Sequence, residues 1–171
     1  MTLIAITIIA AVAIYSTYNA FCLALFGIPE SLSMTFYLWQ KRLGNGYLFV
    51  LMMYWVVGMI MPAWITMSEG SDFQFLAFLA PASLMFVATA PHFLSSPLEN
   101  KVHTIAAYIA AACSLLWVIL VTPYWWTILI WFSIVAVLAI LTSSYRSSLV
   151  YWLETIAFGA TFTSTIAYSL C

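Results

Sequence analysis

The segment PHFLSSPLENKVH, residues 91–103, contains both histidines of the chain, His92 and His103. It also contains Glu99 and Lys101, although the 171 residues include only five acidic and four basic side chains. Imidazole and carboxylate groups can bind metal ions, transfer protons or activate a nucleophile. Their concentration in one short segment of so apolar a chain makes this segment the first candidate for chemistry.

Zinc is the metal that these residue types would suit. Catalytic zinc sites use three protein ligands, in which His and carboxylate are often mixed, and one water. His92, His103 and Glu154 would supply that number, and Glu30 could replace Glu154. The chain has no H-x-x-x-H or H-E-x-x-H pair, so two histidines that cap helix ends or contact lipid phosphate are the simpler interpretation. The cofactor therefore stays unknown, with zinc as an open alternative.

Glu154 is the most informative single residue, because it falls inside a long apolar segment. A carboxylate within hydrocarbon is costly and requires a partner or water. It is either a ligand, proton carrier or general acid–base group, or a structural carboxyl bonded to a neighbouring helix. We take Glu154 and His103 as candidate catalytic residues. The candidate ligand-binding residues, which include two serines that a histidine could activate as nucleophiles, are Asn19, Glu30, Ser31, Ser33, His92 and Thr161.

The composition places the whole chain in a membrane. Two thirds of the residues are hydrophobic (66%), 5% are charged, and the mean hydropathy is +1.11, whereas soluble domains carry about 25% charged residues. Four basic residues cannot form a nucleic-acid surface, and three cysteines match no disulfide or zinc framework. The expected partners are membrane lipids, with further copies of the chain as an open alternative.

We predict an all-α, polytopic transmembrane helix bundle that forms one domain over residues 1–171. A span needs about 20 mostly apolar residues, and Pro, Gly, Ser and charged residues divide the chain into about six. The predicted spans are 2–28, 45–67, 73–91, 102–122, 124–143 and 148–170. Between the first two, Leu32, Phe36, Trp39 and Leu43 recur as one helical stripe. This pattern predicts a short interfacial helix over residues 31–43, unless the second span simply starts early.

The basic residues predict the orientation of these spans. Lys41 and Arg42, Lys101 and Arg146 fall between spans one and two, three and four, and five and six. Since basic residues mark the cytoplasmic side, both termini are predicted to lie outside, in a plasma or inner membrane.

Helical spacing predicts that several polar groups face the interior of the bundle. His103 shares a face with Ala106, Ala110 and Ser114, and small residues at this spacing let helices approach closely. Glu154 shares a face with Thr161. We expect these faces to converge on one polar cavity that opens toward the cytoplasm.

Three short motifs carry a family resemblance. IPESLSMTFY follows the first span, GNGYLFVLMMYWVVG opens the second, and KVHTIAAYIAAACSLLW opens a later one. In this order of features the chain resembles the six-span membrane proteins that include the damage-regulated autophagy modulators and the factors that remodel GPI-anchor lipids. The motif residues of that family would correspond to Pro29, Ser31 or Ser33, and His103. The resemblance implies lipid handling rather than ion conduction, and it would place the serine motif on the opposite side of the membrane.

Three functions remain open on the sequence alone. The first is an integral membrane protein that binds or processes a lipid or other amphiphile in a cytoplasm-facing polar pocket, with hydrolase or transferase chemistry undecided. The second is a small oligomeric transporter or channel that uses Glu154 as its ion or proton site. The third is a structural or accessory membrane subunit in which the polar groups only fasten helices together.

Overall fold

The computed structural model describes residues 3–170, which form helices and connecting turns and contain no strand. The all-α prediction is therefore confirmed for this part of the chain, whereas Thr2, the first residue of the predicted span 2–28, lies outside it. The helices of the described residues are α1 (Leu3–Phe26), α2 (Thr35–Leu43), α3 (Tyr47–Met67), α4 (Gln74–Thr89), α5 (Pro97–Val121), α6 (Trp126–Leu141) and α7 (Leu149–Ser169).

Three of these helices, α1, α3 and α5, are long and apolar enough to cross a membrane. This finding fits a membrane protein. The helices α4 and α6 have 16 residues each, or about 24 Å at 1.5 Å per residue, which is less than the roughly 30 Å of a typical hydrocarbon core.

Helix α5 begins at Pro97, five residues earlier than the predicted boundary at 102. The Ser96 side chain accepts a hydrogen bond from the Glu99 backbone N–H at 3.3 Å, and proline suits the first helical position because it has no N–H to satisfy. This N-cap extends the helix beyond the apolar segment. His103 consequently lies almost two turns inside the helix instead of at its start.

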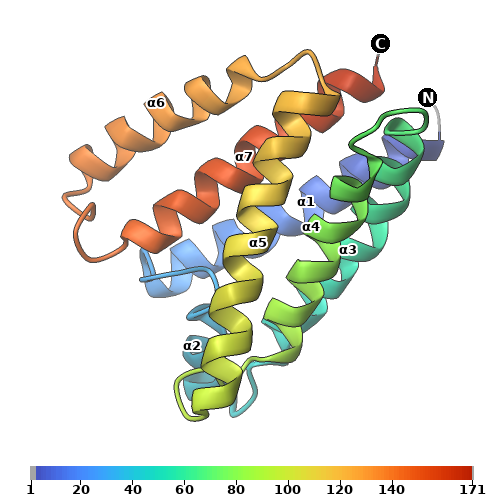
Figure 1. Ribbon diagram of the computed structural model, residues 1–171. Helices are drawn as coiled ribbons and strands as arrows, with labels where there is room; N and C mark the ends of the chain where they lie inside the picture. Colours follow the sequence, from blue (N-terminus) through green and yellow to red (C-terminus); the bar gives the residue numbers. More distant parts are fainter. Residues whose placement is uncertain (1–2, 171) are drawn as a thin grey trace.

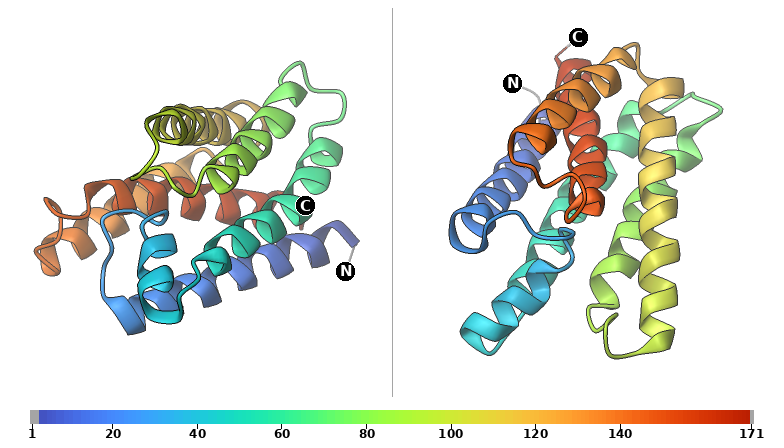
Figure 2. Two further views of the ribbon diagram at one scale, coloured as in Figure 1. Left: turned by 90° about the horizontal axis from the view of Figure 1, so that it is seen from below. Right: turned by 90° about the vertical axis from the view of Figure 1, so that its left-hand side faces the viewer.

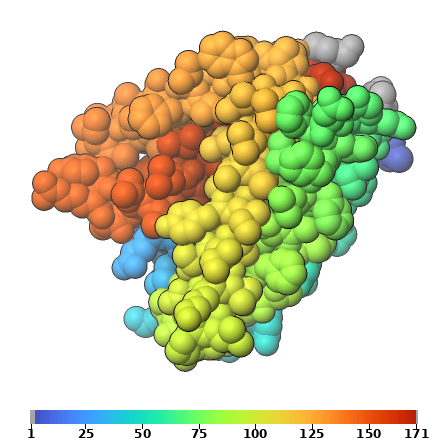
Figure 3. Space-filling view, in the orientation of Figure 1, coloured from blue at the N-terminus to red at the C-terminus, as the bar shows by residue number. Residues whose placement is uncertain are grey.

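The helices form a ring whose principal contacts run from α1 to α3, α4, α5, α7 and back to α1. Helix α6 lies outside this ring and packs mainly on α7. In the space-filling view α4 and α5 cover the near face, and α6 projects away from them at the upper left (Figure 3).

The helices converge at one end of the molecule and separate at the other (Figure 1). The start of α1, the end of α7 and the α3–α4 and α5–α6 turns gather at one end. At the other end the helices separate into two groups, α1, α6 and α7 on one side and α3, α4 and α5 on the other. Helix α2 lies at this end beside the start of α3, and the segment before it connects the end of α1 to α2 (Figure 2). We call residues 27–46, which comprise α2 and the short segments before and after it, the wedge.

The wedge is ordered by its own turn and caps. Residues 31–34 form a hydrogen-bonded turn, so α2 begins at Thr35 and not at 31. Gly44 ends the helix with φ of 73°, a left-handed conformation that glycine adopts without steric cost. The predicted stripe holds for Leu32, Phe36 and Trp39, which are all buried, but Leu43 is 58% exposed.

Two stacked tryptophans join the ring at the end opposite the wedge. The rings of Trp64 on α3 and Trp117 on α5 are parallel within 5°, with centroids 4.3 Å apart. Their indole N–H groups donate to Thr165 on α7 and to Ser68 at the end of α3, at 3.0 and 2.7 Å. Buried indole groups need such partners, so this cluster fixes three helices relative to one another.

Gly159 and Gly58 give a matched test of the α6–α7 contact. A Cβ atom at Gly159 would overlap the Trp131 ring, whereas one at Gly58 would meet nothing within 4 Å. We expect Gly159→Ala to lower the unfolding free energy by about 1–3 kcal/mol, as overpacking does. Gly58→Ala should be neutral or stabilising by up to about 1 kcal/mol, because alanine favours helix. Thermal unfolding in detergent measures both, and equal melting temperatures would contradict this packing.

Candidate functional site: an apolar cavity with a polar end

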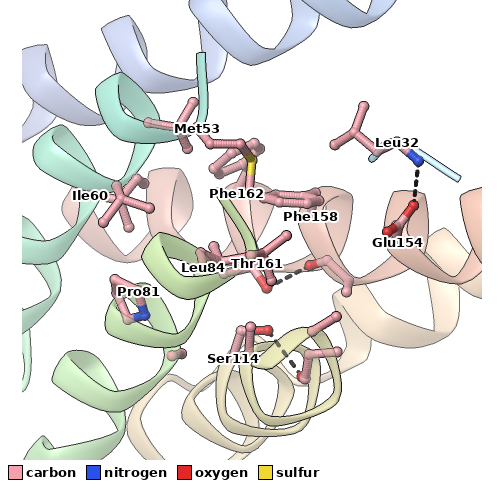
Figure 4. A pocket seen from close by; sticks show the side chains of 18 of the residues that line it. Leu32, Met53, Ile60, Pro81, Leu84, Ser114, Glu154, Phe158, Thr161 and Phe162 are labelled. Atoms are coloured by element: carbon pink, nitrogen blue, oxygen red, sulfur yellow. Dashed lines mark hydrogen bonds between the residues drawn. The ribbon is translucent and has the colours of Figure 1, made fainter. Parts of the chain in front are cut away.

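A cavity of about 80 Å³ lies inside the helix ring, between α3, α4, α5 and α7, and the wedge residues Leu32 and Ser33 close one end (Figure 4). Most of its lining is aliphatic or aromatic, which corrects the expectation of a polar cavity. The Ser114 and Thr161 hydroxyls also line it, but each donates to a carbonyl of its own helix, at 3.0 and 2.6 Å. The polarity of the lining is therefore concentrated at Ser33 and Glu154.

Glu154, the sixth residue of α7, joins this helix to the wedge. Its Oε2 accepts a hydrogen bond of 2.6 Å from the Leu32 backbone N–H, and Figure 4 shows this bond. One turn earlier, the Tyr151 N–H donates to the Glu30 carbonyl at 3.0 Å. The first N–H groups of a helix have no partner within it, so the wedge supplies one here. These two bonds fix residues 30–32 against the start of α7.

His103 on α5 is buried and bonded at both ring nitrogens. Nδ1 lies 3.1 Å from the carbonyl oxygens of both Val87 and Ala90, and Nε2 lies 2.9 Å from the Ser33 Oγ. Because a carbonyl can only accept, Nδ1 must carry the proton, and in the neutral ring Nε2 then accepts from the Ser33 hydroxyl. The Phe93 ring stacks on the imidazole with centroids 4.3 Å apart. The tautomer and the plane of His103 are both fixed.

The remaining candidates lie outside the cavity lining. Glu30 is exposed and contributes its backbone carbonyl, and Asn19 accepts from the Tyr151 hydroxyl at 3.1 Å. Ser31 caps the turn before α2 by accepting from the Met34 N–H at 3.2 Å. Glu30 and Ser31 therefore help to hold the wedge, whereas Asn19 joins α1 to α7.

His92 and His103 have different surroundings. His92 follows α4 in a turn, where its ring and the Phe36 ring form a T-shaped pair with centroids 5.2 Å apart. Its backbone N–H donates to Glu99 at 2.9 Å. Within residues 3–170 no three His, Cys, Asp or Glu side chains gather in a group that could hold a metal ion. The proposed ligand set of His92, His103 and Glu154 is therefore not assembled in this part of the structure.

Several functional groups of the site are backbone atoms, which sequence patterns do not reveal. They are the Leu32 N–H and the Val87 and Ala90 carbonyls. Helical spacing did predict that His103 and Glu154 face inward. It did not pair either residue with the wedge, because spacing gives a direction on each helix and not its neighbours.

Comparison with family models, with curated proteins and with solved structures finds no match for the chain.

Removing the Glu154 carboxylate tests whether it anchors the wedge. Glu154→Ala leaves the Leu32 N–H without its acceptor, and we expect the unfolding free energy to fall by about 1–3 kcal/mol. Glu154→Gln keeps an acceptor oxygen and should recover most of this loss. Glu69→Ala, in an exposed turn, is the control and should stay within about 0.5 kcal/mol. Thermal unfolding in detergent measures all three, and a wild-type melting temperature for Glu154→Ala would refute the anchor.

Proposed function

We propose that this chain is an integral membrane protein that binds the acyl chain of a single-chain amphiphile in the cavity. One observation carries the proposal: the lining is apolar along α3, α4, α5 and α7, and two polar side chains that bond outside their own helix or turn, Ser33 and Glu154, lie together at one end. An acyl chain matches the apolar part, and an ester or head group matches the polar end. Ligand sites commonly combine an apolar lining with a few placed polar groups.

The size of the cavity favours a thin ligand. One water-sized group occupies about 10–15 Å³ on the same measure, so 80 Å³ accommodates a short row of such groups. Along α3 the lining runs from Phe49 to Trp64, which is about 22 Å at 1.5 Å per residue. A cavity that is lined over this length of a helix suits a linear hydrocarbon chain.

The same proposal includes six spans, formed by α1, α3, α4, α5, α6 and α7, with α2 in the inner interface. The positions of the basic residues support it. Lys41 and Arg42 end α2, Lys101 lies in the first turns of α5, and Arg146 lies between α6 and α7, all away from the end where α1 starts and α7 finishes (Figure 1). By the positive-inside rule the wedge then faces the cytoplasm and both termini face outside.

The polarity of the cavity favours binding over conduction. An ion or proton path needs polar groups along its whole length, whereas the lining beyond Ser33 and Glu154 is largely aliphatic and aromatic. The resemblance to six-span proteins that handle lipids favours lipid binding, although it would place the serine motif on the opposite side of the membrane.

Two engineered thiols test the orientation. In a Cys171→Ser background the remaining natural thiols, Cys22 and Cys113, are buried. We expect Asp72→Cys, in the α3–α4 turn, to react with a membrane-impermeant maleimide on intact cells. Ser147→Cys, in the α6–α7 turn, should react only after the cells are opened, because that turn lies with the basic residues. The reverse pattern would overturn the orientation, and reaction of both on intact cells would overturn the six-span topology.

Adjacent alanines of α5 test the ligand. Ala111 lines the cavity, whereas Ala112 is exposed on the outer face of the helix. We expect a diazirine-labelled palmitic acid to cross-link to cavity-lining residues of α3 and α7 in the purified protein. Ala111→Phe fills the cavity and should reduce this cross-linking at least tenfold, and Ala112→Phe should leave it unchanged. Peptide mapping by mass spectrometry locates the adducts, and equal cross-linking in the two variants would refute the cavity as the binding site.

A further inference from the structure

The contact between Ser33 and His103 points to a reaction at the polar end of the cavity. We propose that Ser33 is the nucleophile and His103 the general base of an ester hydrolase, whose substrate is the acyl ester of an alcohol. The inference rests on the proposed function, because the cavity must hold the acyl chain so that its ester carbonyl lies beside Ser33.

The first argument is the protonation pattern of His103. Its Nδ1–H is directed at the Val87 and Ala90 carbonyls, at 3.1 Å each, and this leaves the Nε2 lone pair facing the Ser33 hydroxyl at 2.9 Å. A serine nucleophile requires this arrangement: a base at hydrogen-bond distance, oriented by a third group at its other nitrogen. Backbone carbonyls take the orienting position that a carboxylate occupies in the Ser-His-Asp triad.

The second argument is the placement of those carbonyls. Val87 belongs to the last turn of α4, and Ala90 is its C-cap residue. The C-terminal end of a helix carries partial negative charge and stabilises a nearby cation. When His103 takes the Ser33 proton, the new positive charge forms against this helix end. Phe93 stacks on the ring and keeps it in plane during the transfer.

The third argument is the position of Ser33 itself. Ser33 is 3% exposed and lines the cavity, so an acyl ester within the cavity reaches it. Among the described residues, none accepts a hydrogen bond from the Ser33 backbone N–H. The N–H of the nucleophile is one of the donors that stabilise the oxyanion in serine hydrolases. Ser33 therefore brings both a hydroxyl and an available donor to the same place.

Neighbouring hydroxyls lack these features. Thr35 donates to the Leu32 carbonyl at 2.6 Å and contacts the Tyr18 hydroxyl. Ser31 accepts from a backbone N–H of its own turn. Neither contacts a histidine, so Ser33 alone among the hydroxyl groups of this turn is activated.

The reaction takes place in two halves. The Ser33 Oγ attacks the ester carbonyl carbon while His103 Nε2 takes the hydroxyl proton. The bond between the carbonyl carbon and the alcohol oxygen then breaks, and His103 returns the proton to the leaving alkoxide. In the second half a water molecule attacks the acyl-Ser33 ester, His103 takes the water proton and passes it to the Ser33 Oγ. The products are a free alcohol and a fatty acid, and both side chains are restored.

A decyl fluorophosphonate probe tests the nucleophile directly. It forms a phosphorus–oxygen bond to an activated serine with loss of fluoride, and mass spectrometry locates the adduct. We expect purified full-length protein in detergent to gain one adduct, on Ser33. Ser33→Ala should abolish it. His103→Asn keeps an N–H that can reach the α4 carbonyls and so preserves the fold, but it should slow labelling at least about 100-fold, the usual contribution of a general base. Ser95→Ala, an exposed serine at the same end, should label at the wild-type rate.

The possible outcomes separate this inference from the proposed function. Palmitic acid cross-linking without any Ser33 adduct would overturn the nucleophile and leave the binding function standing. A Ser33 adduct that forms equally fast in His103→Asn would overturn the role of His103. A His103-dependent adduct in a protein that binds no palmitic acid would overturn the acyl ester as substrate. Cooperative thermal unfolding of each variant shows that a lost adduct is not a lost fold.

Discussion

Two hydrogen bonds made by consecutive residues hold the molecule together where its helices separate. Leu32 donates to Glu154 on α7, and Ser33 bonds to His103 on α5. These partners belong to the two helix groups. Because lipid is as apolar as the side chains, burial of apolar surface contributes little to helix association in a membrane, and hydrogen bonds and close packing must supply it. A few polar contacts therefore determine how far the two helix groups separate from each other.

The cavity is a consequence of this arrangement. Helices that meet at one end, through the Trp64–Trp117 stack, and separate at the other cannot fill the space between them with their own side chains. The small residues of α5, such as Ala107, Ala110 and Ala111, widen this space. An apolar void forfeits contacts, so a hydrocarbon ligand that fills it would stabilise the ring.

The sequence predicts the class of fold and the direction of several side chains. Composition and apolar segments predict the helices, and the spacing of His103 and Glu154 predicts that both face inward. The pattern could not reveal that Ser96 starts α5 five residues before its apolar segment, because N-cap geometry depends on local backbone conformation. It also could not show that Thr35 is buried and bonded to the Tyr18 hydroxyl. Such contacts depend on which elements are neighbours, and helical periodicity does not encode that.

The short helices α4 and α6 have a consequence for the surrounding lipid. If both span the membrane, their length of about 24 Å falls about 6 Å short of a hydrocarbon core of about 30 Å. The bilayer must become thinner beside them or the flanking side chains must extend to the surface, and each adjustment has a modest cost per ångström of mismatch. A membrane with a thinner hydrocarbon layer would remove that cost. Under that topology, the length of α4 and α6 would give the protein a preference for thinner membranes.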